Sequence, residues 1–450
     1  MRPKREPKQP QREMFQIDLE QLIDMSHPLV RLGQHIDWES FDVTLGCSYH
    51  PTHGAPGAST RLMVALHYLK YQSDLSDEDV VAAWVENPYW QRFSGERYFQ
   101  HNLPIDPSSM SRWRKRLGES GAEQMLRATI EAGMKMKAIR PSQLLRLNVD
   151  TTVQTKAIRY PTDARSYHRC RERLVDVARS AGLKIKQSYE HVGRRLLMQS
   201  SRYAHARQMK RAKACTRTLR TQLGRVLREI ERQVEKPEGE LKKLLETARK
   251  LHAQQRHDKK KIYSVHEPEV ECIAKGKAGK KYEYGNKVSV AVSSQGGWFV
   301  GSKSFTGNPY DGHTLAEQMK QVEELLGSKK VKEVHVDMGY RGHDYKGAAT
   351  IHVDKRKRGR TPQTLWRRMK HRAAVEPSIG HLKAEHRSER NRLKGVAGNA
   401  INAVLAAAAM NFQKLMRAVQ GARVSEIYAI LSQLLFQGNF SGSGWSLQTA

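Results

Sequence analysis

The sequence has little cysteine, and what it has is widely spaced. Its four cysteines, at positions 47, 170, 215 and 272, form no CxxC pair. This spacing argues against zinc fingers and against a disulfide framework, and it favours a reducing compartment. The remaining composition, 38% hydrophobic and 28% charged over 450 residues, fits a globular protein of two or three domains.

Long apolar runs are also lacking. The most apolar stretch, residues 400–410, contains Asn402 and is followed by Asn411 and Lys414, so it is too short to cross a bilayer and is typical of a core helix. The N-terminal MRPKREPKQPQRE is charged and proline-rich and shows no secretory signal. We therefore expect a cytoplasmic protein that has no membrane partner.

Acidic residues are scarce relative to basic ones. Lys and Arg total 78 against 46 Asp and Glu, a formal net charge of +32. Such a chain usually meets a polyanion, most often DNA or RNA. Residues 165–261 hold 28 Lys and Arg against 10 Asp and Glu and thus supply +18 of this charge. Leucine spacing here predicts a basic helical hairpin, inserted over residues 165–262, that contacts DNA or is merely solvated.

The first part of the chain is predicted to be helical. A disordered basic tail over residues 1–13 precedes a helical domain, residues 14–138, with a role in DNA binding or dimerisation. Helix starts are expected at Ser59 and Ser76, and a third helix spans residues 107–118. That helix carries four basic residues around a tryptophan, which suits either a helix-turn-helix-like DNA contact or an ordinary solvated face. These residues are Arg112, Arg114, Lys115 and Arg116.

Strand patterns dominate the second half. The order is a strand with Asp150, the helical insertion, a hairpin turning at Gly296-Gly297, a helix, a strand ending at Asp337, a strand at residues 351–354, and a closing helical region. This order predicts an α/β fold, a mixed sheet with helices on its faces. If the strands of Asp150 and Asp337 are adjacent and parallel, their carboxyl ends bring the two acids within about 5 Å.

Converging carboxylates favour Mg²⁺, because hard divalent cations prefer oxygen ligands. Asp150 and Asp337 would be joined by Glu376 from a helix packed on the sheet, and together they could hold two ions. Arg372 and Lys383 flank Glu376 and would meet phosphate. Because proline disfavours helical geometry in the residue before it, Pro377 predicts a helix that begins near Glu376, with Arg372 on the preceding turn.

With these pieces in this order, residues 15–415 resemble a bacterial insertion-sequence transposase of the DDE class, the IS-five type. The matching motifs are PIDPSSMSRWRKRLG, NVDTTV, YPTDAR, KYEYGNKVSVAV, GNPYDGHTL, VDMGYRG and AVEPSIGHLK. The resemblance implies an RNase H-like catalytic domain over residues 139–418, with residues 419–450 as a tail outside it. It also implies Asp150, Asp337 and Glu376 as the catalytic and metal-binding triad.

The family's closing signature, Tyr-x2-Arg-x3-Glu-x6-Lys, is met by Arg372, Glu376 and Lys383, whereas Met369 stands at the tyrosine position. The implied function is cutting of transposon ends and joining of their 3′-OH groups to target DNA, with two Mg²⁺ ions (or Mn²⁺) and a homodimer that pairs the ends. Two alternatives remain, a DNA-binding relative without catalysis and a nuclease of the same fold that never joins strands.

Further residues are candidate DNA contacts. Asp311 is either a helix N-cap or a neighbour of the site, and the histidines near the acids lack zinc-ligand spacing. The additional candidate DNA contacts are Tyr340, Arg341, His313, Lys355, Arg356, Lys357 and Arg358.

Overall fold

The computed structural model describes residues 17–46, 49, 53, 56–255, 257–274, 281–327, 330–354, 363, 367–368 and 371–438, with side chains to residue 422. The N-terminal region is helical. Its helices are α1 (Leu19–Leu22), α2 (Pro28–His35), α3 (Trp38–Gly46), α4 (Thr60–Gln72), α5 (Asp77–Glu86), α6 (Pro88–Phe93) and α7 (Ser108–Lys135).

The predicted helix starts are confirmed. Ser59 caps α4 by accepting from the backbone of Leu62, and Ser76 and Asp79 form a capping box at the start of α5. The predicted end at Gly118 marks a kink within α7, because Gly118 has a φ of 64° and the chain turns helical again after it.

Six strands form one curled mixed sheet in the described part of the chain. After the short η1 (Pro141–Leu145), they are β1 (Arg146–Thr155), β2 (Glu271–Ala274), β3 (Tyr282–Ser293), β4 (Phe299–Phe305), β5 (Glu333–Val336) and β6 (Thr350–Val353). The order is β2-β3-β1-β5-β6, with β4 also paired to β3. β3 is antiparallel to β1, β2 and β4, whereas β5 is parallel to both β1 and β6.

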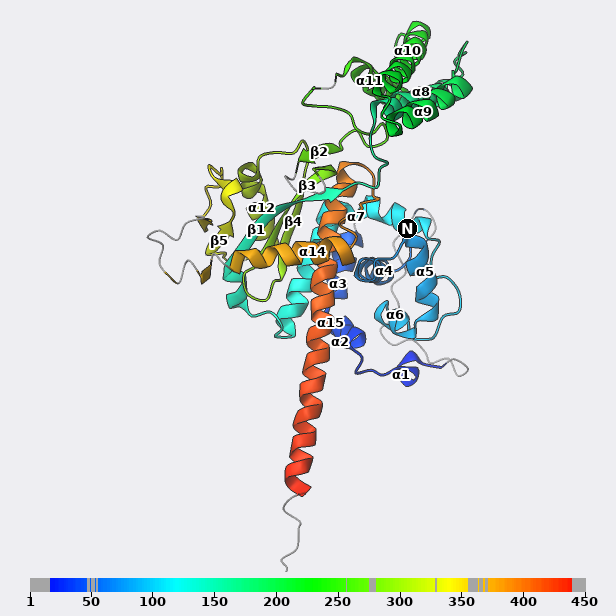
Figure 1. Cartoon of the computed structure of the whole chain (residues 1–450). Coiled ribbons are helices and arrows are strands. Elements are labelled where there is room, and N and C mark those ends of the chain that lie inside the picture. Colours follow the sequence, from blue (N-terminus) through cyan, green and yellow to red (C-terminus); the bar gives the residue numbers. More distant parts are fainter. Residues whose placement is uncertain are drawn as a thin grey trace, which may run out of the picture.

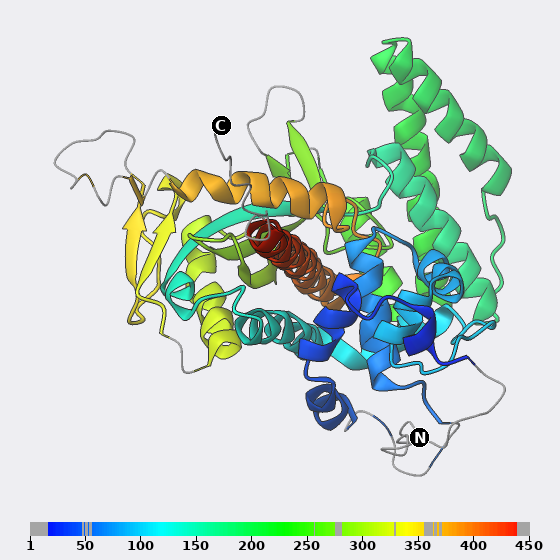
Figure 2. The same ribbon diagram turned by 90° about the horizontal axis from the view of Figure 1, so that it is seen from below.

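Helices cover the sheet. The remaining core elements are α12 (Asp311–Leu326), η2 (Met338–Tyr340), η3 (Arg372–Ala374), α14 (Val375–Glu385) and α15 (Gly395–Gly438). α14 packs against β1, and α12 packs against β3, β4 and α7. Figure 2 shows α14, in orange, on one side of the sheet and α12 and α7 on the other. The observed mixed α/β fold fits an RNase H-like architecture.

The helical insertion lies between β1 and β2 and is larger than the predicted hairpin. Two of its helices, α10 (Met209–Gln233) and α11 (Gly239–Ala253), correspond to the predicted pair, but α8 (Asp163–Ser180) and α9 (Glu190–His205) were not predicted. All four surround an apolar core of their own, separate from that of the sheet. They stand apart from the rest of the chain as the green group in Figure 1.

The last helix, α15, joins the N-terminal helices to the sheet. It packs against α4 and α7 on one side and β4 on the other, and it runs between them in Figures 1 and 2. Its segment Gly395–Ala422 is long and apolar enough to cross a membrane, but 83% of its most apolar window is buried inside the protein. It therefore serves as the predicted core helix.

Buried amides fix the position of α15. Asn402 accepts from the Tyr71 hydroxyl at 2.9 Å and donates to Gln154 at 2.8 Å, so it connects α4 with β1. Asn411 bonds both the N–H and the C=O of Phe299 on β4 at 2.8 Å. Because buried amides are costly unless paired, these contacts select one register of the helix. Around these amides, the apolar side chains of the N-terminal helices, α15 and the sheet form one continuous core.

Phe412 tests this shared core, because its ring is fully buried and lies 5.1 Å from Tyr68 and 5.5 Å from Phe93 between centroids. We expect Phe412→Ala to lower the free energy of unfolding by about 3–5 kcal/mol through lost burial and a cavity. Denaturant unfolding followed by circular dichroism measures it. Val396→Ala, at a residue of α15 that is 51% exposed, should change stability by less than about 0.5 kcal/mol. Similar losses in both variants would contradict a core role.

Candidate active site

Asp150 and Asp337 lie abreast on neighbouring parallel strands. Asn148 of β1 is aligned with His335 of β5, and both aspartates follow two residues later. Two residues along a strand restore the same face, so the two aspartates lie on one face of the sheet, on strands that are about 5 Å apart. Asp337 follows β5 directly, as predicted. The expectation that Asp150 ends its strand is wrong, because β1 continues to Thr155 by pairing with β3.

Arg372 brings Glu376 to this pair. Its Nη1 lies 3.3 Å from Oδ2 of Asp150, and its Nη2 lies 3.9 Å from Oε1 of Glu376. The Arg372 side chain is only 13% exposed, whereas Glu376 is 68% exposed. Both carboxylates therefore approach a single, largely buried guanidinium group, which draws together the acids of β1 and α14.

The helix start predicted near Glu376 is confirmed. α14 begins at Val375, and Arg372 belongs to the short η3 that precedes it. Proline is tolerated in a first helical turn, where its missing N–H has no intrahelical partner. This local geometry places Arg372 and Glu376 on successive turns that face β1.

Asp354 is a further acid that the sequence analysis left without a role. Val336 of β5 is aligned with Val353 of β6, so Asp337 and Asp354 follow at the same level. Oδ2 of Asp354 lies 3.9 Å from Nε of Arg372. The signal was present in the sequence, because IHVD repeats the pattern of EVHVD, an apolar strand that ends in aspartate.

Asp311 also belongs to the site. It accepts from the Thr151 hydroxyl at 2.9 Å and from Lys287 Nζ at 2.8 Å. The helix N-cap is Tyr310, so Asp311 is the first residue of α12, and its side chain bonds to β1 and β3. Of the two earlier interpretations, the neighbour of the site is therefore the one that the contacts support.

Burial raises the pKa of Asp337 above its usual value. The Arg372 guanidinium and a hydrogen bond from the Gly339 N–H lower that pKa, and the charges of Asp311 and Asp354 raise it further. The carboxylate is thus short of compensating positive charge. A divalent cation would supply that charge, since like charges in close proximity otherwise favour a protonated acid.

The donors at this site suit a hard divalent cation, because all are carboxylate oxygens. Among the described residues, however, no three acids, histidines or cysteines already lie close enough to form a metal cluster. Instead the carboxylates of Asp150, Asp354 and Glu376 are arranged around Arg372. The donor chemistry fits Mg²⁺, with Asp150, Asp337 and Glu376 as the residues that would hold it.

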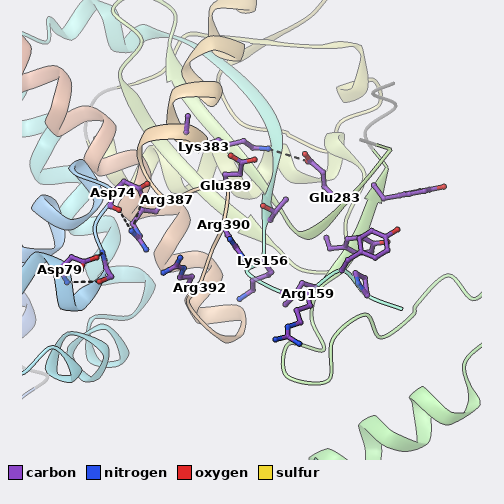
Figure 3. A pocket seen from close by; sticks show the side chains of 18 residues that line it. Asp74, Asp79, Lys156, Arg159, Glu283, Lys383, Arg387, Glu389, Arg390 and Arg392 are labelled. Carbon is purple, nitrogen blue, oxygen red and sulfur yellow. Dashed lines mark hydrogen bonds and ion pairs between the residues drawn. The ribbon is translucent and has the colours of Figure 1, made fainter. Parts of the chain in front are cut away.

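Lys383 lies away from the acids. It is seven residues after Glu376 on α14, a rise of about 10 Å. Its Nζ is 3.8 Å from Oε2 of Glu283 on β3, as the dashed line in Figure 3 shows. Lys383 also lines a cavity that lies between the start of α5, the end of α14 and the start of β3.

Two neighbours of Asp337 are core residues. Tyr340 is fully buried, so it does not reach DNA in this conformation, contrary to one earlier expectation. His335 is also buried and stacks on His352 at 5.1 Å between centroids, and burial lowers the pKa of His335 to about 4. Arg341 and His313 are exposed and remain candidate DNA contacts.

The basic helix start at residues 108–118 is only partly on the surface. Arg112, Lys115 and Arg116 are exposed. Arg114 is 5% exposed and donates through both terminal nitrogens to Asp77, whose Oδ1 also accepts from Lys70 at 2.6 Å. The prediction that Arg114 contacts DNA is therefore wrong, because the guanidinium is used inside the fold.

Several expected residues lie outside the described residues. They are Lys355, Arg356, Lys357, Arg358, Met369, the tail over residues 1–13 and the last part, residues 439–450, of the tail predicted over residues 419–450. The first part of that predicted tail, residues 419–438, is instead a continuation of helix α15.

Comparisons with known proteins match both halves of the chain. Residues 17–116 match a transposase domain family (DUF772), and residues 246–412 match the transposase DDE domain family. The second match contains Asp337 and Glu376 and begins after Asp150. An uncharacterized protein, ORF8 in the nfe locus of Rhizobium meliloti, is 49% identical over 208 residues, which is its whole length and 46% of this chain. No solved structure matches.

The protein is an α/β protein in which a mixed sheet carries a group of carboxylates on adjacent strands. Two transposase families cover its helical N-terminal region and most of that sheet. The chain belongs to the DDE transposases of bacterial insertion sequences, and it is thus a protein of a mobile element.

Arg114 is buried against Asp77 and Arg112 is exposed, so substitutions at the two positions test whether Arg114 stabilises the fold. Arg114→Gln should lower the free energy of unfolding by about 3–5 kcal/mol, because it leaves the Asp77 carboxylate without its main partner in a largely buried site. Arg112→Gln, at an exposed position in the first part of α7, should change the free energy of unfolding by less than about 0.5 kcal/mol. Urea unfolding compares the variants. Equal stability of the two would contradict a structural role for Arg114.

The same ion pair predicts acid sensitivity. Burial acts to raise the pKa of the Asp77 carboxyl. The hydrogen bonds and charges of Arg114 and Lys70 outweigh burial and hold that pKa below its usual value. The stabilisation is therefore complete above the unfolded pKa, about 3.9, and is lost as pH falls toward the lower folded value. We expect Asp77→Asn to flatten the decline of stability below about pH 4. A decline as steep as in the unaltered protein would place the acid-sensitive group elsewhere.

Proposed function

We propose that this transposase cuts the ends of its insertion sequence and joins their 3′-OH groups to target DNA in one site, the acid centre formed by Asp150, Asp337 and Glu376. The observation that carries the proposal is the alignment of Asp150 with Asp337, together with the approach of Glu376 to the same guanidinium as Asp150. A centre that holds several carboxylates on one face of a sheet suits repeated phosphoryl transfer, in which water and then a 3′-OH is the nucleophile.

Each residue has a distinct part in this proposal. Asp150 and Asp337, on rigid strands, would bind Mg²⁺ or Mn²⁺, and Glu376 would complete a second ion's ligands from α14. The bound ions would activate the attacking hydroxyl and stabilise the leaving oxygen. Arg372 holds a fixed positive charge beside the acids, where the phosphate gains negative charge. Asp311, which also accepts from Lys287, holds the side chain of Thr151 next to Asp150 on β1.

The partners follow from the reaction. The substrate is double-stranded DNA, first the terminal inverted repeats and then the target. Because the two transposon ends must be held side by side while they are joined to target DNA, we propose a homodimer in the complex that pairs them. The N-terminal helices share their core with the sheet, so a contact of the exposed Lys115 and Arg116 with DNA would also orient the acid centre.

Asp337 provides the main test of catalysis. Asp337→Asn should reduce cleavage of a duplex bearing the inverted repeats that flank the reading frame by about 10³-fold or more. Binding of that duplex, measured by gel shift, should persist. The control is Asp344→Asn, which removes an exposed acid outside the acid centre and should leave both properties unchanged. Full cleavage by the Asp337 variant would refute the proposed centre.

Strand joining separates a transposase from a nuclease. A pre-cut duplex end with a free 3′-OH, incubated with supercoiled plasmid and Mg²⁺, should yield covalently joined product. Chelation of the metal should abolish joining while DNA binding remains, because phosphate contacts made by Arg and Lys need no metal. Cleavage without any joined product would identify the chain as a nuclease, and joining that persists in chelator would exclude the metal.

A further inference from the structure

An extended basic segment lies beside the end of β1. Residue Lys156 forms a parallel bridge with Asn391, and the backbone N–H groups of Ala157 and Asn391 donate to Asn391 and Thr155 at 2.9 and 2.8 Å. Side chains of extended backbone alternate between faces. Asn391 accordingly points inward and is buried, whereas Arg390 and Arg392 on either side of it are exposed.

Two cavities meet at this segment. One, of about 830 Å³, lies between the start of α5, the end of α14 and the start of β3. The other, of about 1140 Å³, lies between the segment and helices α8 and α9 of the insertion. Residues of both linings show that they adjoin: Lys156, Ile158, Arg159, Pro161, Arg390 and Arg392. We call the two together the basic groove; Figure 3 shows the first of them.

The charge of the groove is unevenly compensated. The cavity beside the insertion is lined by eight Lys and Arg residues and three Glu residues. Glu283 and Asp74, in the other cavity, already face Lys383 and Arg387 at 3.8 and 3.2 Å. Over the described residues, by contrast, the guanidinium groups of three exposed arginines make no ion pair or hydrogen bond. They are Arg159, Arg390 and Arg392.

The groove also lies close enough to Asp150 and Glu376 for one DNA duplex to reach both. β1 runs from Asp150 to Thr155 at the groove, about 17 Å, and α14 runs from Glu376 to Lys383, about 10 Å. Since phosphates along one DNA strand are about 3.4 Å apart in rise, this corresponds to about 3–5 nucleotides. A duplex with its scissile phosphate at the acids would thus reach the groove.

We propose that the basic groove binds the phosphate backbone of duplex DNA, with Arg159, Arg390 and Arg392 as its phosphate contacts. This inference rests on the proposed function, because it takes DNA as the substrate of the acid centre. The proposal places the main DNA contact between the helical insertion and the sheet. Guanidinium groups suit this task, because they stay charged and offer several donors to phosphate oxygens.

The test measures binding to a fluorescent duplex of about 30 base pairs and mixed sequence, in chelator, by anisotropy at several salt concentrations. The triple variant Arg159→Gln, Arg390→Gln, Arg392→Gln should lower the slope of log K against log salt by about 3, one per lost phosphate contact. Affinity at moderate salt should fall on the order of 10²-fold. Because no cleavage is involved, this result is independent of Asp337→Asn, which tests the proposed function separately.

Two matched triples control the test. Arg217→Gln, Arg228→Gln and Arg232→Gln remove equal charge from exposed positions of α10 that line neither cavity, and they should leave the slope nearly unchanged. The Lys versions of the groove triple keep the charge and should restore most of the slope. An unchanged slope in the groove triple, an equal loss in the α10 triple, or a loss in the Lys triple would each overturn the proposal.

Discussion

Parallel pairing of β5 with β1 on one side and with β6 on the other is the constraint on which the site depends. That register sets Asp150, Asp337 and Asp354 abreast on one face. Like charges so close together repel and would favour protonation. The Arg372 guanidinium offsets part of this repulsion, and Pro377 explains its location, because it fixes the start of α14 and leaves Arg372 on the turn before.

Local patterns in the sequence predicted the positions of strands and helix starts better than they predicted which strands pair with one another. Alternating residues identified β3, β4, β5 and β6, and capping residues identified the starts of α4 and α5. The pairing of β1 with β5 joins residues far apart in the chain, so the sequence could only state it as a condition. Asp150 lies within its strand because β3 extends the pairing to Thr155. Such a long-range partner leaves no mark near Asp150 itself.

Charge was harder to interpret than hydrophobicity. Arg114 and Arg112 belong to the same basic run, yet Arg114 is buried against Asp77, which lies 37 residues earlier in the chain. Arg390 and Arg392 belong to a run with no motif, yet they are exposed at a groove. Basic runs indicate where positive charge is available, and only the packing decides which of it faces solvent. The four-helix insertion shows the same limit, because α9 has few fully buried residues.

Helix α15 gives the protein an unusual dependence on the late part of its own chain. This helix begins at Gly395 and packs against α4, α7 and β4. A growing polypeptide must therefore extend beyond Gly395 before the earliest helices find their final neighbour, although domains commonly fold in order from the N-terminus. Prematurely terminated products would therefore lack a finished interior on both sides of this helix. Under the proposed function, fragments that end before this helix would bind and cut DNA poorly, so cleavage would depend on completion of the interior around it.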